Sequence, residues 1–426
     1  MNPELQRNLW LEASPFRLML ITGLVLLAFA ATSVAPGLAT TSTVARGLYL
    51  FFAVLWGTRS AALSVVAEIR ERTWDSQKLS SIGPWEMVWG KLFGATAANW
   101  FGALLCLPFI LWPAALEAGL ASALTHGVIL LTLGVFAQSV ALLSSLVMIR
   151  RNTGNWRLDI FLCQVAGVGA AFTYYSLWSS VSAFARSGTS MLTWWGHGFS
   201  LGNFHLVSLL VFLGWALIGC WRAMRAELRF ANGPYVWLAY LAYSAVYSAG
   251  FESWIGPRLN MPASPVAAKL ALAGLTLLAS TYSMAFLEPK DPVRLRWLGE
   301  QIRAGHLYKA FLALDCWMLS YGATLAVGLV LALSWTTSPA GSLAVLGFLT
   351  RDVAIFVLMR GRAGGKGDFA ALAILGALYL LLPTVLSGLG LQGLDFLFLP
   401  QGMLGVIAGW AQGVACAWLA LKRIRA

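Results

Sequence analysis

Long apolar runs separated by short polar segments recur along almost the whole chain. An α-helix needs about 20 apolar residues to cross a hydrocarbon core of roughly 30 Å. By this measure the seventh run is short for a span. The pattern predicts twelve membrane-spanning helices, at approximately residues 17–39, 43–66, 93–115, 124–149, 159–184, 204–222, 235–251, 265–287, 310–335, 343–359, 369–390 and 403–421.

Lysine and arginine are distributed unequally between the two sides that this layout creates. With the N-terminus inside, four basic residues face outward and two lie within spans: Arg46, Arg186, Arg258 and Lys269, then Arg59 and Arg351. All the others lie in inner segments, which is the pattern that orients multi-pass proteins. We therefore expect both termini to be cytoplasmic. Inner clusters such as Arg222, Arg225 and Arg229 would also attract anionic membrane lipids.

Two long inner segments divide the chain into similar halves. Residues 68–92 follow the second expected span, and residues 288–309 follow the eighth. This repetition indicates two parallel six-helix halves, residues 1–230 and residues 231–426. Parallel repeats place a transport pathway at the interface between the halves.

Composition agrees with an all-α multi-pass membrane protein, which we expect in a bacterial inner membrane. The chain has 426 residues, of which 59% are hydrophobic and 11% charged, against about 25% charged in soluble domains. No polar stretch is long enough for a soluble domain, so we expect any ATP-hydrolysing module to be a separate chain. The net charge of +12 is spread over short clusters between spans, which argues against nucleic-acid binding.

The residues offer no catalytic, cofactor or metal site. Five cysteines all lie in apolar runs without a CxxC pair, and the four histidines have no metal-ligand spacing. Residues 361–368, GRAGGKGD, lack both the first glycine and the Ser or Thr of a phosphate-binding loop. We therefore expect no enzyme activity and no bound cofactor on this chain.

The segment 68–92 has the pattern of two short helices on the membrane surface. Glu68 and Arg72 stand at i,i+4, the favourable order for an ion pair. Gly83-Pro84 ends the first helix, and Pro84 suits the first position of the second. Lys91 then leads into the third span, where we expect its ammonium at the lipid headgroups. An apolar face towards the bilayer or the neighbouring spans can come from Ile69, Trp74, Leu79 and Ile82.

This segment resembles the coupling region of permease subunits of type-two ATP-binding-cassette exporters. The residues that carry the resemblance are Glu68, Arg70, Glu71, Thr73, Leu79, Ser80, Pro84, Gly90 and Lys91. Arg72 departs from the family pattern, which commonly has Gly before the Thr. The second set of six spans is a larger departure, since family permeases usually have six and pair as dimers.

The resemblance implies the function of an export permease with a dimeric cytoplasmic ATPase as partner, which binds ATP and Mg²⁺. It implies that coupling to the ATPase involves Glu68, Arg70, Glu71, Arg72, Thr73, Leu79, Pro84 and Lys91. The family also has re-entrant outer gate segments, which match residues 190–204 and 389–402. In the first of these, Trp194, Trp195 and Phe199 are the candidate gate residues.

Four ionisable residues lie within expected spans, where charge is costly and often functional: Arg59, Asp315, Arg351 and Asp352. They are candidates for pathway residues or structural ion pairs. Adjacent residues such as Arg351 and Asp352 do not face each other on a helix, so we expect each to need another partner.

Two other functions stay open at this point. One is an ion-coupled secondary transporter, in which the buried ionisable residues would be essential. The other is a non-transporting anchor subunit of a larger complex. The substrate, the number of chains that form the pore, and a partner on the outer side are not specified by the sequence.

Overall fold

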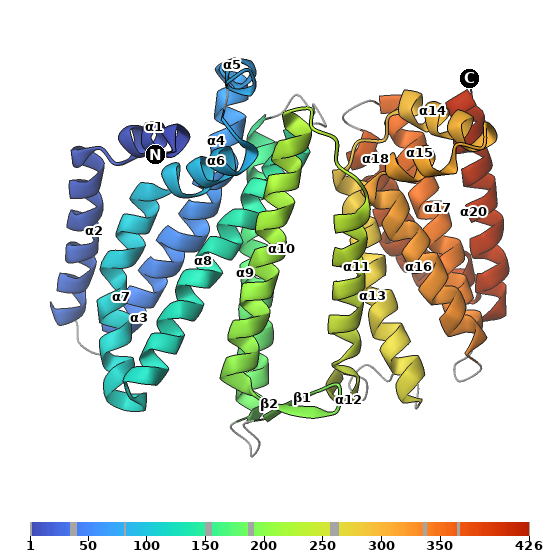
Figure 1. The fold of residues 1–426 in the computed structure, drawn as a ribbon. Coiled ribbons are helices and arrows are strands. Elements are labelled where there is room, and N and C mark those ends of the chain that lie inside the picture. The colour runs from blue at the N-terminus through green and yellow to red at the C-terminus, as the bar shows by residue number, and fades with distance from the viewer. Residues whose placement is uncertain are drawn as a thin grey trace. The chain divides into compact units, whose positions relative to one another are not determined.

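The computed structural model describes residues 2–34, 41–80, 82–149, 156–185, 191–255, 264–334, 339–363 and 367–425. These residues are almost entirely helical (Figure 1). Eleven of the described helical stretches are long and apolar enough to cross a membrane. The chain is therefore an all-α, multi-pass membrane protein. It folds as two compact units, the first made mainly of residues 1–150, 155–192 and 199–232, and the second mainly of residues 233–426.

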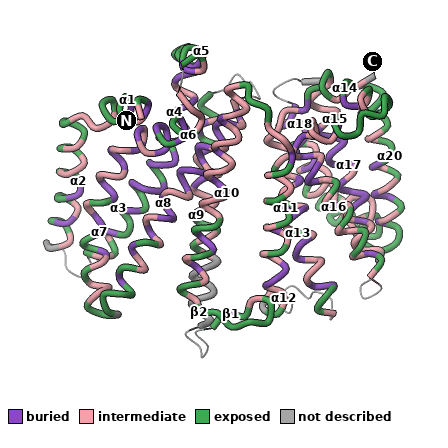
Figure 2. Tube along the Cα trace, viewed as in Figure 1, coloured by how far each residue is buried: buried purple, intermediate pink, exposed green. Residues whose placement is uncertain are grey.

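The first unit is a bundle built around a long central helix, α8. Its elements are α1 (Pro3–Glu12), α2 (Pro15–Val34), α3 (Thr41–Tyr49), η1 (Leu50–Trp56), α4 (Gly57–Arg70), α5 (Trp74–Lys78), α6 (Pro84–Trp89), η2 (Gly90–Gly94), α7 (Ala97–Ala118), α8 (Leu120–Met148), α9 (Trp156–Ala185) and α10 (Leu201–Glu227). Helix α8 packs against α4, α7, α9 and α10, and buried positions follow it along the bundle (Figure 2). By contrast, α2 buries few of its residues, so its apolar surface is suited to lipid.

The second membrane span of this unit contains a π-helical turn, η1. A π-turn leaves backbone carbonyls without their usual partners, which is costly in hydrocarbon. Here Gln138 Nε2 donates to Ala53 O at 2.8 Å, and Gln164 Nε2 donates to Leu55 O at 2.9 Å. Glutamines from α8 and α9 therefore donate hydrogen bonds to two carbonyls of this turn.

The second unit contains α11 (Tyr235–Ala249), α12 (Glu252–Ile255), α13 (Pro265–Leu287), α14 (Pro292–Arg303), α15 (Leu307–Leu312), α16 (Cys316–Leu333), α17 (Pro339–Ala363), α18 (Gly367–Gly376), η6 (Ala377–Leu381), α19 (Leu382–Gly388), η7 (Gln392–Leu397) and α20 (Gly402–Arg425). Its tightest helix pair is α17 with α20. A Cβ on Gly413 would lie 2.8 Å from Gly347 O, and one on Gly409 would lie 3.2 Å from Ala344 O. Glycines four residues apart thus let two membrane helices approach closely.

The seventh and ninth expected spans are shorter in the structure. Helix α11 replaces the seventh span and has 15 residues, about 22 Å at 1.5 Å per residue, which is less than the hydrocarbon thickness. The ninth span begins at Cys316 instead of residue 310, because residues 307–312 form the separate helix α15. The count of twelve spans therefore stays a prediction.

Residues 191–200 form a β-hairpin, which differs from the re-entrant segment expected there. Strands β1 (Met191–Trp194) and β2 (His197–Ser200) are paired. The two loop residues, Trp195 and Gly196, have φ angles of 52° and 77°, as a two-residue hairpin loop of type I′ requires. Exposed strand edges are not stable in hydrocarbon, so the hairpin suits a position outside it. In the other expected gate segment, residues 392–397 form a short 3-10 helix.

Candidate functional site

Helix α4 ends in a Schellman turn that is formed by Arg72. Thr73 N–H bonds to Glu68 O at 2.9 Å, and Arg72 N–H bonds to Ile69 O at 3.1 Å. This turn needs a left-handed residue at the position that Arg72 occupies, with φ of 59°. Glycine adopts that conformation at the lowest cost. The exporter permeases that this segment resembles commonly have glycine here. Glycine would therefore fit the local geometry better than Arg72 does.

The helix α5 that follows is anchored on one side and exposed on the other. Trp74 is only 3% exposed and packs with Val65, Met87 and Met224 in the core of the first unit. Leu79, just after the helix, is 88% exposed. Leu79 therefore does not pack against neighbouring spans, and its expected position towards the bilayer stays a prediction.

Helix α6 begins where the sequence predicts. Pro84 is its first residue, and the Glu86 carboxylate accepts the Gly83 backbone N–H at 3.1 Å. This bond stabilises the start of the helix, because it satisfies an N–H that has no partner in the helix. Residues 68–92 thus contain two short helices, as predicted, but the first of them, α5, ends at Lys78 and not at Gly83-Pro84.

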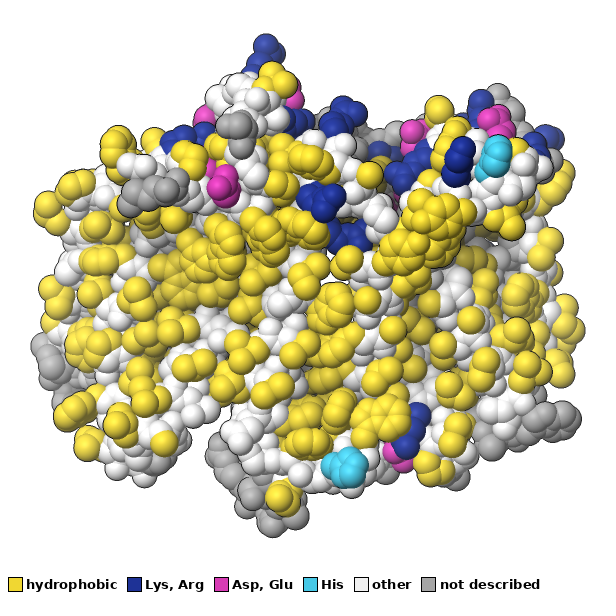
Figure 3. All heavy atoms as spheres, in the orientation of Figure 1, with side chains coloured by type: hydrophobic (Ala, Val, Ile, Leu, Met, Phe, Trp, Pro, Cys, Tyr) yellow, Lys and Arg dark blue, Asp and Glu magenta, His cyan; other side chains and the backbone are white. Residues whose placement is uncertain are grey.

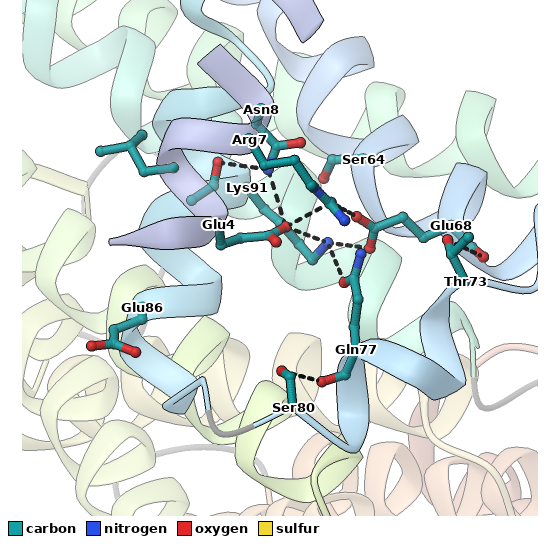
Figure 4. Close-up of polar contacts among 12 residues, drawn as sticks. Glu4, Arg7, Asn8, Ser64, Glu68, Thr73, Gln77, Ser80, Glu86 and Lys91 are labelled. Atoms are coloured by element: carbon teal, nitrogen blue, oxygen red, sulfur yellow. Dashed lines mark hydrogen bonds and ion pairs between the residues drawn. The ribbon is translucent and has the colours of Figure 1, made fainter. Parts of the chain in front are cut away.

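A buried polar network joins this segment to the N-terminal helix α1 (Figure 4). The Lys91 ammonium is fully buried and pairs with Glu68 and, at 3.3 Å, with Glu4 Oε1. Arg7 pairs with the same two carboxylates. Its Nη2 lies 3.0 Å from Glu4 Oε1 and also contacts Glu68 Oε1. Gln77 Oε1 lies 3.5 Å from Lys91 Nζ. Two cations and two carboxylates therefore balance within one cluster.

Two contacts expected from the sequence are wrong. Glu68 does not pair with Arg72, because α4 ends at Arg70 and the turn that follows breaks the i,i+4 geometry. Lys91 does not lie free at the headgroups, because Glu68 and Glu4 hold it inside the unit. Glu68 and Lys91 thus stabilise the segment through a buried ion pair. The residues exposed on its surface include Glu71, Arg72, Thr73 and Leu79.

Helix α1 packs closely against two glycines of η2, the helical turn that follows α6. A Cβ on Gly90 would lie 2.7 Å from Glu4 Cβ, and one on Gly94 would lie 2.6 Å from Asn8 Cβ. Asn2 caps α1 by accepting the Glu4 N–H, and it also donates to Glu86 O at 2.7 Å. Sequence reasoning missed Glu4, Arg7 and Asn8, although their spacing places them on one helix face.

The second inner segment, residues 288–309, has its own buried charges. Lys290 and Asp368 are both fully buried and lie 3.0 Å apart. Arg294 Nη2 lies 2.9 Å from Asp315 Oδ1, at the start of α16. Burial, together with the nearby Glu288 carboxylate, raises the pKa of Asp315 to about 7. Helix α14 ends, as α4 does, in a turn with a left-handed residue, here Gly305 with φ of 78°.

Arg351 and Asp352 lie in a buried cluster among four helices of the second unit. Contrary to the expectation, they pair directly, with Arg351 Nε 2.9 Å from Asp352 Oδ1, because the long arginine side chain reaches its neighbour. Tyr282 and Tyr379 hydroxyls donate to Asp352 Oδ2 at 2.6 Å and 2.7 Å. Gln412 accepts from Arg351 at 3.0 Å. The charges are thus compensated inside the bundle.

The remaining candidates lie apart from both clusters. Arg59 is exposed on α4 and makes no ion pair with any described residue. Trp194 and Trp195 of the hairpin donate their indole N–H groups to Tyr247 O and Val246 O, at 3.1 Å and 3.2 Å. Phe199 contacts Phe204, with ring centroids 5.7 Å apart.

Comparison with known proteins adds no family to this description. The sequence matches no family model, no curated protein and no solved structure.

Proposed function

We propose that this chain is the membrane-spanning permease subunit of an ATP-driven exporter, in a bacterial inner membrane with both termini cytoplasmic. The observation that carries the proposal is the form of residues 68–92. The helix-turn-helix has a surface for a partner around α5, where Glu71, Arg72 and Leu79 are exposed. Its base is tied by buried ion pairs to α1 and to the helical turn before α7. A force on α5 would therefore displace the helix ends that these ion pairs join, and not only a surface loop.

A separate ATPase would supply the push, and the chain itself would do no chemistry. In this proposal, the ATPase dimerises on ATP with Mg²⁺ and displaces residues 68–92, and residues 288–309 form the corresponding segment of the second half. With α11 counted as a span, twelve spans form two parallel six-helix halves. An apolar groove of about 320 Å³ beside η1, lined mainly by residues of η1, α8 and α9, would suit an amphipathic cargo.

The decisive experiment is gentle affinity purification from native membranes, followed by an ATPase assay. We expect an ATPase to co-purify in fixed ratio. Leu79→Ser should weaken this association without changing the melting temperature, because Leu79 is 88% exposed. Leu389→Ser is the matched control, since Leu389 is 68% exposed and lies outside both inner segments.

Two results would count against the permease proposal. One is full ATP-dependent transport by a variant that combines Glu71→Gln, Arg72→Gln and Leu79→Ser. The other is a chain that purifies alone, without ATPase activity, and transports along an ion gradient. The second result would favour the secondary transporter, for which the buried Arg351–Asp352 pair is the specific observation. In that case Asp352→Asn should abolish transport.

A further inference from the structure

A column of stacked aromatic rings lies at the end of the first unit where α6 meets α10. Trp221 of α10 stacks on Trp85 at 5.8 Å between ring centroids. Trp85 stacks on Trp89 at 6.1 Å, and Trp89 stacks on Phe93 at 5.2 Å. Successive ring planes differ by 17° to 23°. Trp85 and Trp89 are 38% and 37% exposed, so the column presents a partly exposed apolar face.

An arginine closes one end of this aromatic column. The Arg225 guanidinium carbon lies 4.8 Å from the centre of the Trp221 ring. Its Nη2 donates to Ala231 O at 3.3 Å, while its Nε is buried without a hydrogen-bond partner. Arg225 makes no ion pair with any residue that the structure describes. A positive charge without a matching carboxylate thus stands beside a large apolar surface.

The position of the column fits a lipid headgroup region. Trp221 and Arg225 lie in the last two turns of the membrane helix α10, and α6 directly precedes η2 and α7. Tryptophan is enriched at this depth, where an apolar ring and a polar N–H are both satisfied. In the face shown in Figure 3, Lys and Arg side chains gather at the edge of the first unit where α5 and α6 lie, above a largely hydrophobic surface.

We propose that the aromatic column and Arg225 bind one anionic phospholipid, in the membrane leaflet at this end of α10. The phosphate would pair with the guanidinium, and an acyl chain would lie along Trp85 and Trp89. The charge favours an anionic headgroup, and the apolar face favours a lipid over a soluble phosphate. Because Trp85 and Trp89 belong to α6, the lipid would also fix the position of residues 68–92. Lipid binding requires no ATPase, so this inference stands or falls independently of the proposed function.

The test compares two arginines at the same helix end. The purified full chain is placed in nanodiscs of phosphatidylcholine alone or mixed equally with phosphatidylglycerol, and retained lipid is measured by native mass spectrometry. Arg225→Gln should lower phosphatidylglycerol retention roughly fivefold. Arg229→Gln removes the same charge, but Arg229 is exposed and lies outside the column, so retention should change little.

Fluorescence gives a second readout for the rings. Brominated phosphatidylglycerol should quench the wild type more than the Trp85→Phe/Trp89→Phe variant, because these two indoles lie along the expected acyl chain. Equal losses of lipid for both arginine variants would mean a diffuse basic surface and overturn the proposed site. Equal quenching of wild type and variant would mean that protein covers the column, and would also overturn it.

Discussion

The Lys91 ammonium lies 3.3 Å from Glu4 Oε1, across 87 positions of sequence. This contact makes the N-terminal helix part of the same polar cluster as residues 68–92. It also explains how a fully buried lysine is tolerated, since a buried charge is stable only when it is paired and hydrogen-bonded.

Loss of the Lys91 charge should destabilise the first unit strongly. Lys91→Met leaves Glu4 and Glu68 with Arg7 alone, and breaking a buried pair costs about 3–5 kcal/mol. The melting temperature of the detergent-solubilised chain measures the effect. Lys78→Met is the control, because Lys78 pairs with the 89% exposed Asp75, and such surface pairs contribute at most about 1 kcal/mol. Similar melting temperatures for both variants would contradict the network.

The fit of α1 against η2 should depend on the absence of a side chain at Gly90. Gly90→Ala would place a Cβ 2.9 Å from Leu5 N, and overpacking of this kind costs about 1–3 kcal/mol. Hydrogen exchange should then show faster exchange of the α1 amides. Gly23→Ala in α2 is the matched control, since a Cβ there meets nothing within 4 Å. Unchanged α1 exchange in Gly90→Ala would argue against the packing described.

Arg72→Gly should stabilise the turn after α4. A left-handed residue other than glycine costs about 1–2 kcal/mol, part of which glycine recovers. Arg70→Gly makes the same change two residues earlier, at the last residue of the helix, and should cost up to about 1 kcal/mol. Urea unfolding of the two variants distinguishes these directions. A loss of stability in Arg72→Gly would mean that the arginine side chain matters more than the turn.

Asp315 should make the stability of the second unit depend on pH. Its pKa rises from 3.8 to about 7 in the folded chain, so between these values the folded state binds more protons than the unfolded state. The free energy of unfolding should therefore fall as pH rises from 3.8 to about 7. Asp315→Asn should reduce this slope in thermal unfolding measured across the range. An unchanged slope would exclude Asp315 as its source.

Hydropathy predicts the membrane helices of this chain well, because each long helix such as α8 or α10 needs an apolar run of matching length. The pattern places α11 within two residues of its observed bounds. It misses the start of α16, because the apolar residues of α15 precede that helix and only a turn separates the two. The start of α6 at Pro84 was also predictable, because proline fixes its own backbone, whereas nothing in the sequence indicated that α5 ends at Lys78.

Side-chain partners were far less predictable than helices. The partner of Glu68 could not be inferred from its neighbours, because Lys91 and Arg7 reach it through tertiary packing. The hairpin at residues 191–200 had one local signal, Gly196 at a loop position that needs positive φ, which a search for apolar spans overlooks. The left-handed turn at Arg72 had none in this sequence, because an arginine replaces the glycine that would indicate it.

The π-turn η1 also sets the direction in which the rest of its helix points. One residue of an α-helix corresponds to a rotation of about 100°, and a π-turn takes up one extra residue, so the residues after η1 face about 100° away from where an unbroken α-helix would place them. Glu68 lies at the far end of this same helix, so its ion pair with Lys91 depends on the rotation that η1 introduces. Conversion of Leu50–Trp56 into a regular α-helix of the same length would thus swing Glu68 away from its partners, although it would leave every charged residue of the chain in place.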